Sequence, residues 1–274
     1  MIPKAGWIGY RNSRKIGGKP KNLTISKEAG NWYVSVQIEV HHQKFPVHES
    51  VSVAVVDVGV NRFAALSDGS RIAPANSLKK SEKKLSRLQR RLSRQKKFSR
   101  NWQKSKAQNQ KLHHHIANQR KENLHNASCD ISKNHAMVVM EDLKVNNMTA
   151  SAKSKVEKPG RNVRQKPGLN KAILDQGWGE LKRQTGYKLD WQGGLLVLVN
   201  PAYTSQTCSE CGHVAEENRN TQAEFRYVKC GHAENADTNE AKNIKAAGLR
   251  RVSLWRAGVA KPLDEAETYL KAAA

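Results

Sequence analysis

The clearest chemical pattern in the chain is formed by three cysteines. Cys208 and Cys211 are separated by two residues, and Cys230 opens a second triplet, Cys-Gly-His, that repeats the end of the first. Zn²⁺ prefers about four tetrahedral N or S ligands, and a two-residue gap lets both thiolates of a turn point at one ion. The spacing therefore predicts a zinc ribbon over residues 207–232, with these three cysteines as zinc ligands.

The fourth zinc ligand is open. A regular ribbon carries a cysteine at position 227, where this chain has Tyr227, so His213 or His232 would have to complete the shell. Two other interpretations stay open. The ribbon could keep its fold through packing while its thiols hold metal weakly, or Cys208 and Cys211 could form a disulfide, which a reducing compartment disfavours.

Three acids occur in settings that favour a second kind of metal site. Asp57 lies near the end of the apolar run VSVAVVDV, Glu141 ends the run HAMVVME, and Asp237 opens a helical stretch. A carboxylate at the end of so apolar a strand is costly unless it is paired or ligates a cation. A few convergent carboxylates can bind Mg²⁺ or Mn²⁺ for phosphodiester hydrolysis. Alternatively, Asp57 forms a turn, and Asn235, Asp237 or Thr238 only caps a helix.

The elements that must position these acids can be read from hydrophobic patterns. Residues 51–58, 135–141 and 195–199 are continuous apolar runs, typical of strands buried on both faces. Residues 62–67 predict the next strand of a meander, closed by a turn at Asp68-Gly69. Residues 146–168, rich in Ser, Lys, Pro and Gly, predict a linker, after which a helical pattern resumes from about Asn170.

Two further regions flank this core. Residues 76–128 predict a helical hairpin with leucine stripes and a bend at 98–101. Residues 1–50 read as β, with short strands at 6–10, 22–26 and 32–40. A three-stranded fragment needs something to pack on, so we expect it to belong to a barrel or to the main domain.

The charge points to a polyanionic partner. The chain has 48 Lys and Arg against 24 Asp and Glu, a formal net charge of +24. For such an excess, nucleic acid is the favoured partner, although part of the hairpin's charge could simply be a solvated face. No basic amphipathic helix with an aromatic face, leader-type apolar region or membrane-length run stands out, so we expect no membrane and a cytoplasmic, nucleoid-associated protein.

Four segments together resemble the RuvC-type nuclease core of the TnpB family, the transposon-encoded RNA-guided endonucleases. They are VVDVGVNRFAALSDG, VVMEDLKVNNM, VNPAYTSQTCSECGHV and CGHAENADTNEAKNI. The resemblance implies an α/β fold: an RNase H-like (RuvC) core with a helical hairpin insertion, an inserted zinc ribbon and an N-terminal β-barrel remnant. The implied divisions are a barrel remnant at 1–50, a core at 51–206 with the hairpin at 76–128, the ribbon at 207–232, and a final core segment and tail at 233–274.

By the same resemblance, Asp57, Glu141 and Asp237 take the positions of the family's catalytic, metal-binding acids, and the three cysteines those of zinc ligands. The family pairs a guide RNA from the transposon end with target DNA and cleaves the DNA. This chain departs from the family at Tyr227 and Glu240, and begins inside the family's N-terminal barrel. We therefore expect an RNA-guided, Mg²⁺-dependent DNA endonuclease that is incomplete in targeting. The alternative is a non-cleaving, nucleic-acid-binding remnant; the three acids speak against a generic zinc-ribbon protein.

Overall fold

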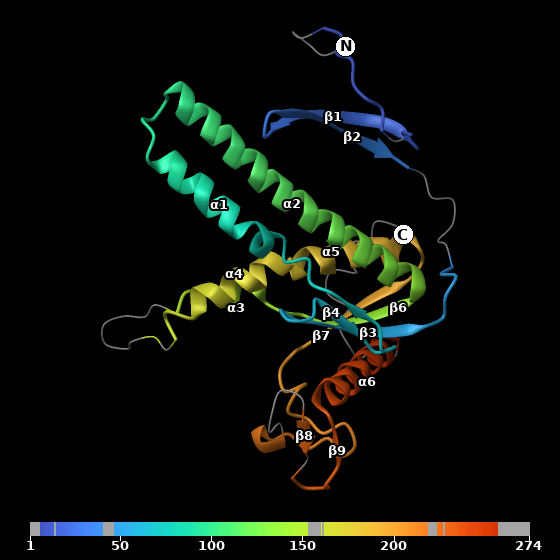
Figure 1. The fold of residues 1–274 in the computed structure, drawn as a ribbon. Helices are drawn as coiled ribbons and strands as arrows, with labels where there is room; N and C mark the ends of the chain where they lie inside the picture. Colours follow the sequence, from blue (N-terminus) through green and yellow to red (C-terminus); the bar gives the residue numbers. More distant parts are fainter. Residues whose placement is uncertain are drawn as a thin grey trace. The chain divides into compact units, whose positions relative to one another are not determined.

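In a computed structural model, residues 6–13, 15–40, 47–152, 160, 162–218, 224–226 and 228–256 are described (Figure 1). The chain divides into two compact units. Unit 1 comprises Met1–Phe45 and Lys80–Asn118, and unit 2 comprises Pro46–Lys79 and Gln119–Ala274. Tyr227, part of the predicted linker (153–159 and 161) and the tail from 257 lie outside the described residues.

Unit 2 contains a five-stranded mixed sheet in the order β5-β4-β3-β6-β7. Its strands are β3 (Val53–Val58), β4 (Ala64–Leu66), β5 (Arg71–Ile72), β6 (Met137–Glu141) and β7 (Leu195–Val199). β3, β6 and β7 are parallel, whereas β4 and β5 continue from β3 as an antiparallel meander. The strands predicted from apolar runs are therefore present, and the predicted α/β class is confirmed.

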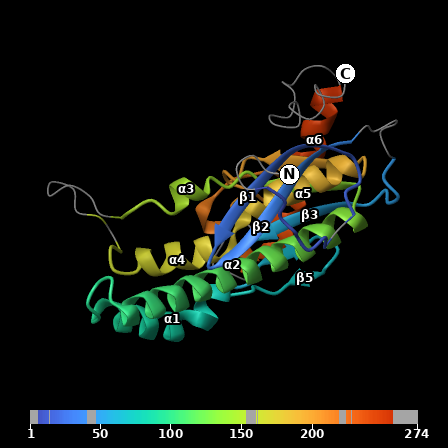
Figure 2. The ribbon, with the colours of Figure 1, turned by 90° about the horizontal axis from the view of Figure 1, so that it is seen from above.

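Six α-helices are assigned within the described residues. They are α1 (Ser77–Ser93), α2 (Arg100–Asn134), α3 (Val145–Met148), α4 (Lys166–Gln176), α5 (Trp178–Trp191) and α6 (Ala236–Arg256). The predicted helical hairpin is thus α1 and α2, and its bend falls between Ser93 and Arg100. Helix α4 begins four residues earlier than predicted because Pro167, within its first turn, needs no amide partner. Helices α4 and α5 follow each other in a row, joined by Gly177 (Figure 2).

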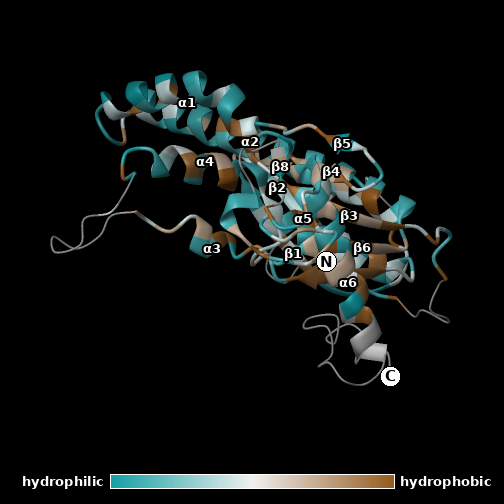
Figure 3. Ribbon diagram, turned by 90° about the horizontal axis from the view of Figure 1, so that it is seen from below, coloured by the Kyte–Doolittle hydropathy of each residue, from teal (hydrophilic) through white to brown (hydrophobic). Residues whose placement is uncertain are grey.

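The central strands are buried on both faces because alternate residues pack on different helices. Val56, Val138 and Met140 belong to a core with Leu124 of α2 and Leu181 of α5. The intervening valines form a second core with Ile244 of α6; they are Val55, Val139, Val197 and Val199. Unit 2 is therefore a three-layer arrangement, with α6 alone on the second face among the described helices. Strands β3 and β6 are largely brown in the hydropathy view, whereas most of α1 is teal (Figure 3).

Unit 1 contains an antiparallel hairpin of β1 (Lys19–Glu28) and β2 (Asn31–Glu39). The chain reverses at Ala29 and Gly30, both with positive φ. The hairpin contacts α2 through Tyr33, whose hydroxyl lies 2.8 Å from Nε2 of His114. The strand predicted at 6–10 is wrong for residues 7–10, which have no regular structure. The described residues of 1–50 therefore form two strands where three were expected.

Short strands complete the predicted ribbon region. β8 (Glu224–Arg226) pairs antiparallel with β9 (Ala233–Asn235), and a 3₁₀ turn covers Glu216–Asn218. β9 runs directly into α6. The ribbon region therefore ends where the helix carrying Asp237 begins.

Candidate active site and metal centre

Asp57 and Glu141 lie side by side in the register of the sheet. Val56 of β3 pairs with Met140 of β6, and each acid follows directly after its paired residue. Because side chains alternate along a strand, both acids share the face of Val55 and Val139, which is the face covered by α6. The two carboxylates are thus carried by the same end of adjacent parallel strands.

Burial at the end of β6 disfavours the charged form of Glu141. Burial raises the pKa of its carboxyl, the Thr204 hydroxyl lowers it, and the nearby Asp57 carboxylate raises it further, for a net upward shift. The Thr204 hydroxyl donates to Oε1 of Glu141 at 2.7 Å. A negative charge is therefore unfavourable here unless a cation neutralises it.

Asp237 occupies the first turn of α6 without acting as its cap. The side chain of Asn235 accepts the backbone N–H of Asp237 at 3.0 Å and that of Thr238 at 3.4 Å, so Asn235 is the N-cap. The Asp237 carboxylate instead faces Arg62, whose Nη1 lies 3.1 Å from Oδ2. This ion pair joins the β3–β4 turn to α6, and both side chains are half-exposed.

The structure brings the three acids to one end of the sheet but not into one tight cluster. Among the described residues, one group of three or more His, Cys, Asp or Glu side chains has all of its possible ligand atoms within 4.8 Å of one another. This group consists of the three cysteines. The carboxylates of Asp57, Glu141 and Asp237 do not form such a set. The Asp237 carboxylate is instead paired with the Arg62 guanidinium.

Two asparagines of α6 connect this site to the ribbon. Asn239, fully buried, donates to the Thr207 carbonyl at 2.8 Å and accepts the Ser209 amide at 2.8 Å. Asn243 donates to the carbonyls of Thr204 and Thr207 at 3.0 and 2.7 Å. Helix α6 therefore fixes the segment that carries both Thr204 and the first cysteine.

The three predicted zinc ligands do converge. The sulfurs of Cys208, Cys211 and Cys230 lie within 4.8 Å of one another, and Cys208 and Cys230 are 3.9 Å apart. Zn–S bonds of about 2.3 Å in a tetrahedron separate sulfurs by about 3.8 Å, whereas a disulfide needs about 2.05 Å. The cysteines are free, which contradicts the Cys208–Cys211 disulfide alternative. The spacing fits a metal.

Neither histidine joins this group in the described part of the chain. His232 instead lies beside Glu234, with Nε2 and Oε2 at 3.4 Å. A backbone hydrogen bond at His232 lowers the pKa of the Cys230 thiol, but lost hydration and the neighbouring Cys208 and Cys211 outweigh it, so the net shift is upward. A bound cation would reverse that shift by favouring the thiolates.

Several residues around the acids could not be found from sequence. Thr204, Arg62, Asn239 and Asn243 all make the contacts described above, yet each is an ordinary polar residue in its local sequence. The only usable signal was position: Asn239 and Asn243 are four apart and share one helix face. The partners of Asn239 and Asn243 lie 30 or more residues away along the chain, so no local pattern identifies them.

No helix among the described residues is long and apolar enough to cross a membrane.

Two family models match the chain. Residues 33–152 match OrfB_IS605, described as "Probable transposase", and residues 178–244 match "Cas12f1-like, TNB domain". The first covers β2 to α3 and includes Asp57 and Glu141. The second includes Asp237 and the three cysteines.

The chain is similar to curated proteins along most of its length. It is 55% identical over 248 residues to "Putative RNA-guided DNA endonuclease InsQ" of Escherichia coli (strain K12), covering 90% of this chain and 61% of that protein. It is 30% identical over 246 residues to "Putative RNA-guided DNA endonuclease" of Streptomyces pristinaespiralis, covering 88% and 57%. The chain thus spans about three-fifths of the length of these relatives.

A solved structure described as "Cryo-EM structure of the Cas12f1-sgRNA-target DNA complex" aligns with a TM-score of 0.49 and 22% identity. The alignment covers 78% of this chain and 42% of that chain.

Proposed function

We propose that this chain, which belongs to the TnpB family, forms the nuclease core of an RNA-guided DNA endonuclease. Both curated relatives carry that activity in their names. The proposed reaction is metal-dependent hydrolysis of a phosphodiester bond in DNA. The proposed partners are the DNA and a guide RNA from the transposon end.

One observation carries this proposal. Asp57 and Glu141 come directly after Val56 and Met140, which pair with each other on the neighbouring parallel strands β3 and β6. Both acids lie on the face of the sheet that α6 covers, and Asp237 is the second residue of α6. We infer an RNase H-like (RuvC) core from this mixed sheet and from the placement of its acids. The same arrangement supports Asp57, Glu141 and Asp237 as the catalytic residues.

The donor set fits the metals we propose. Carboxylate oxygens suit Mg²⁺ or Mn²⁺. At Glu141, where burial and the neighbouring Asp57 carboxylate disfavour the negative charge, a bound cation would stabilise the ionised form. When bound, such ions activate water and stabilise the leaving oxygen of the scissile phosphate. The acids would hold the ions, Thr204 would orient Glu141, and Cys208, Cys211 and Cys230 would hold Zn²⁺ beside α6.

A cleavage assay tests the proposal. The purified chain, with RNA co-expressed from its flanking DNA, is incubated with single- and double-stranded DNA and Mg²⁺. We expect Asp57→Asn and Asp237→Asn each to abolish cleavage while nucleic-acid binding is retained. Asp130→Asn, an identical charge change on the exposed surface of α2, is the matched control and should cleave like the unaltered chain.

The second candidate is a nucleic-acid-binding protein that does not cleave. The ion pair between Arg62 and Asp237 favours it, because this guanidinium already neutralises one of the three acids. Tight binding without cleavage under any metal or RNA condition would establish this candidate and overturn the nuclease proposal.

A further inference from the structure

The bend of the helical hairpin, residues 94–99 between α1 and α2, carries an aromatic side chain in an unusual place. Phe98 is 77% exposed, so it adds little to any core. Its φ is 67°, a left-handed conformation that glycine or asparagine adopts readily and a bulky residue does not. A phenylalanine here costs stability twice, through its backbone and through its exposure.

The surrounding hydrogen bonds hold this conformation in place. The Ser99 hydroxyl accepts the backbone N–H of Trp102 at 3.2 Å and so caps α2. The Gln103 side chain donates to the Phe98 carbonyl at 3.3 Å. The bend is therefore a built turn that presents the Phe98 ring outward.

A second ring and a cation adjoin Phe98. The Trp102 ring lies 5.4 Å from it, centroid to centroid, with an interplanar angle of 51°, and Lys106 Nζ lies 5.0 Å from the Trp102 centroid. The pair thus forms a small aromatic platform with a positive charge at one side. All three residues belong to unit 1.

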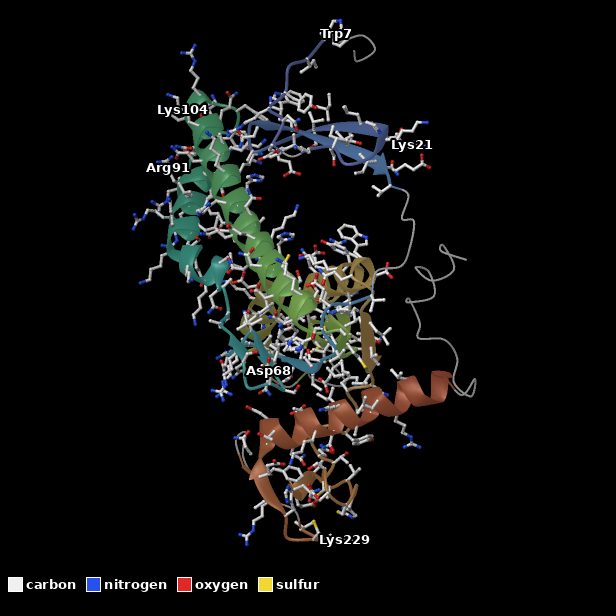
Figure 4. All side chains as sticks on the ribbon, turned by 90° about the vertical axis from the view of Figure 1, so that its right-hand side faces the viewer. Trp7, Lys21, Asp68, Arg91, Lys104 and Lys229 are labelled. Carbon is white, nitrogen blue, oxygen red and sulfur yellow. The ribbon has the colours of Figure 1, made fainter. Side chains whose placement is uncertain are left out.

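The part of the hairpin around this platform carries only positively charged side chains among its Asp, Glu, Lys and Arg positions. Between Glu82 and Glu122 the sequence contains 14 lysine and arginine residues and no acid. Arg91 on α1 and Lys104 on α2 are two of these residues near the bend (Figure 4). A partner must therefore be strongly anionic and must also offer a flat apolar face, and an unpaired nucleotide combines a phosphate with a stackable base.

We propose that the Phe98 and Trp102 rings form a stacking site for an unpaired base of RNA or DNA, whose phosphates lie along the basic sides of the hairpin. A base pair inside a continuous duplex already stacks on both faces, so the site selects single strands, loops or ends. This inference shares with the proposed function only the class of partner and does not depend on cleavage.

The test compares binding by variants that keep the turn. Phe98→Asn removes the ring but tolerates the left-handed backbone, and Phe98→Tyr keeps the ring. Trp191→Ala, which removes a 63% exposed ring on α5, is the control. Fluorescence anisotropy measures the affinity of each chain for labelled 20-nucleotide RNA, for the same sequence as DNA, and for the blunt duplex.

We expect Phe98→Asn to weaken single-strand binding by roughly fivefold to a hundredfold, the range for loss of one base–aromatic stack. Duplex affinity should change less than about twofold, and Phe98→Tyr and Trp191→Ala should bind like the unaltered chain. Whichever of single-stranded RNA and single-stranded DNA loses more affinity for the Phe98→Asn chain is the nucleic acid that the site binds.

Three outcomes overturn the inference. Phe98→Asn could bind single strands normally, it could lose single-strand and duplex affinity equally, or the unaltered chain could prefer phosphatidylserine vesicles to both nucleic acids. If the unaltered chain binds no nucleic acid, the proposed function fails as well. Normal binding by Phe98→Asn alone removes only the stacking site.

Discussion

At the end of β6, the Glu141 carboxylate is held where its charged form is unfavourable. Burial and the neighbouring Asp57 both raise its pKa, and the Thr204 hydroxyl opposes them. That hydroxyl also fixes Oε1 of Glu141. We therefore propose that Thr204 is a positioning residue, which would act on a bound metal only through Glu141.

Replacing Thr204 with valine should weaken the affinity of the proposed nuclease site for Mg²⁺ while the fold persists. The change keeps the shape of the side chain but removes the donor to Glu141. Loss of such a supporting hydrogen bond typically costs about tenfold to a hundredfold in metal affinity or activity. We expect the Mg²⁺ concentration for half-maximal cleavage to rise at least about tenfold.

Thr207→Val is the matched control for this prediction. The Thr207 hydroxyl donates to the Tyr203 carbonyl at 2.7 Å, on the same segment but away from the acids. Its Mg²⁺ titration should overlie that of the unaltered chain. Equal shifts in the two variants would mean that the segment, not the Glu141 contact, sets the metal requirement.

Among the elements, α6 does most to position the site, and it lies unusually close to the sheet. A Cβ atom on Gly248 would lie 2.7 Å from both methyl groups of Val139, which is fully buried in β6. Any larger residue at 248 must push the helix away from the strand that ends in Glu141. The close approach therefore links helix packing to the distance between Asp237 and the strand acids.

Gly248→Ala should destabilise the chain despite the better helix propensity of alanine. Overpacking a tight core costs about 1–3 kcal/mol, whereas alanine gains about 1 kcal/mol over glycine in a helix. We expect a net loss of up to about 2 kcal/mol in urea unfolding. Val139→Ala opens room for the new methyl group. The variant with both changes should therefore lose less unfolding free energy than the sum of the losses in the two single variants, by about 0.5 kcal/mol or more. Additive losses would show that the clash does not exist.

Helix α5 carries a charge cluster that makes stability depend on pH. Glu180 accepts hydrogen bonds from Arg183 and Gln184, and the Arg183 bonds lower the pKa of its carboxyl from 4.5 to about 2. The pKa of Glu180 is lower in the folded chain than in the unfolded chain. The ionised carboxylate therefore stabilises the fold above pH 4.5, and this stabilisation disappears as the pH falls from 4.5 toward 2.

Glu180→Gln should therefore destabilise the chain near neutral pH and lose that effect in acid. The carboxylate is 37% exposed, so solvent screening keeps the difference below about 1 kcal/mol. Urea unfolding at pH 7, 5, 4 and 3 measures the free-energy difference from the unaltered chain, which should narrow only at the lowest values. Glu122→Gln, at an exposed position on α2, is the control for the loss of one carboxylate. A difference for Glu180→Gln that stays constant across these pH values would refute the assignment.

The central elements could be predicted from sequence because their signals are local. The run at 195–199 is apolar throughout, so β7 was predicted with its observed bounds. The acids at strand ends and the three cysteines were equally visible. Thr204 and Arg62 were not, because each acquires its role from a partner 63 or 175 residues away. Residues 7–10 resemble a strand in composition, but strand pairing, which composition does not encode, decided against it.

For the molecule as a whole, the proposed ribbon and the proposed nuclease core share the same backbone segment. Residues 204–209 carry the Glu141 partner and the first cysteine, and Asn239 and Asn243 of α6 bind this segment through its carbonyls. A metal that fixes the cysteines therefore also fixes the start of α6, where Asp237 lies. Zinc would act on cleavage through position alone.

This coupling gives the final prediction, which concerns metal content. Cys211→Ser removes one of the three converging sulfurs, whereas Cys129→Ser alters the one cysteine outside the group and serves as its control. Assayed for zinc by mass spectrometry, the unaltered chain and Cys129→Ser should each hold about one ion, and Cys211→Ser clearly less, because thiolates supply most of the affinity. Cys211→Ser should also unfold at a lower temperature and cleave more slowly at saturating Mg²⁺. Full zinc content in Cys211→Ser would place the metal elsewhere, and normal cleavage without zinc would show that packing alone holds α6 in register with the strand acids.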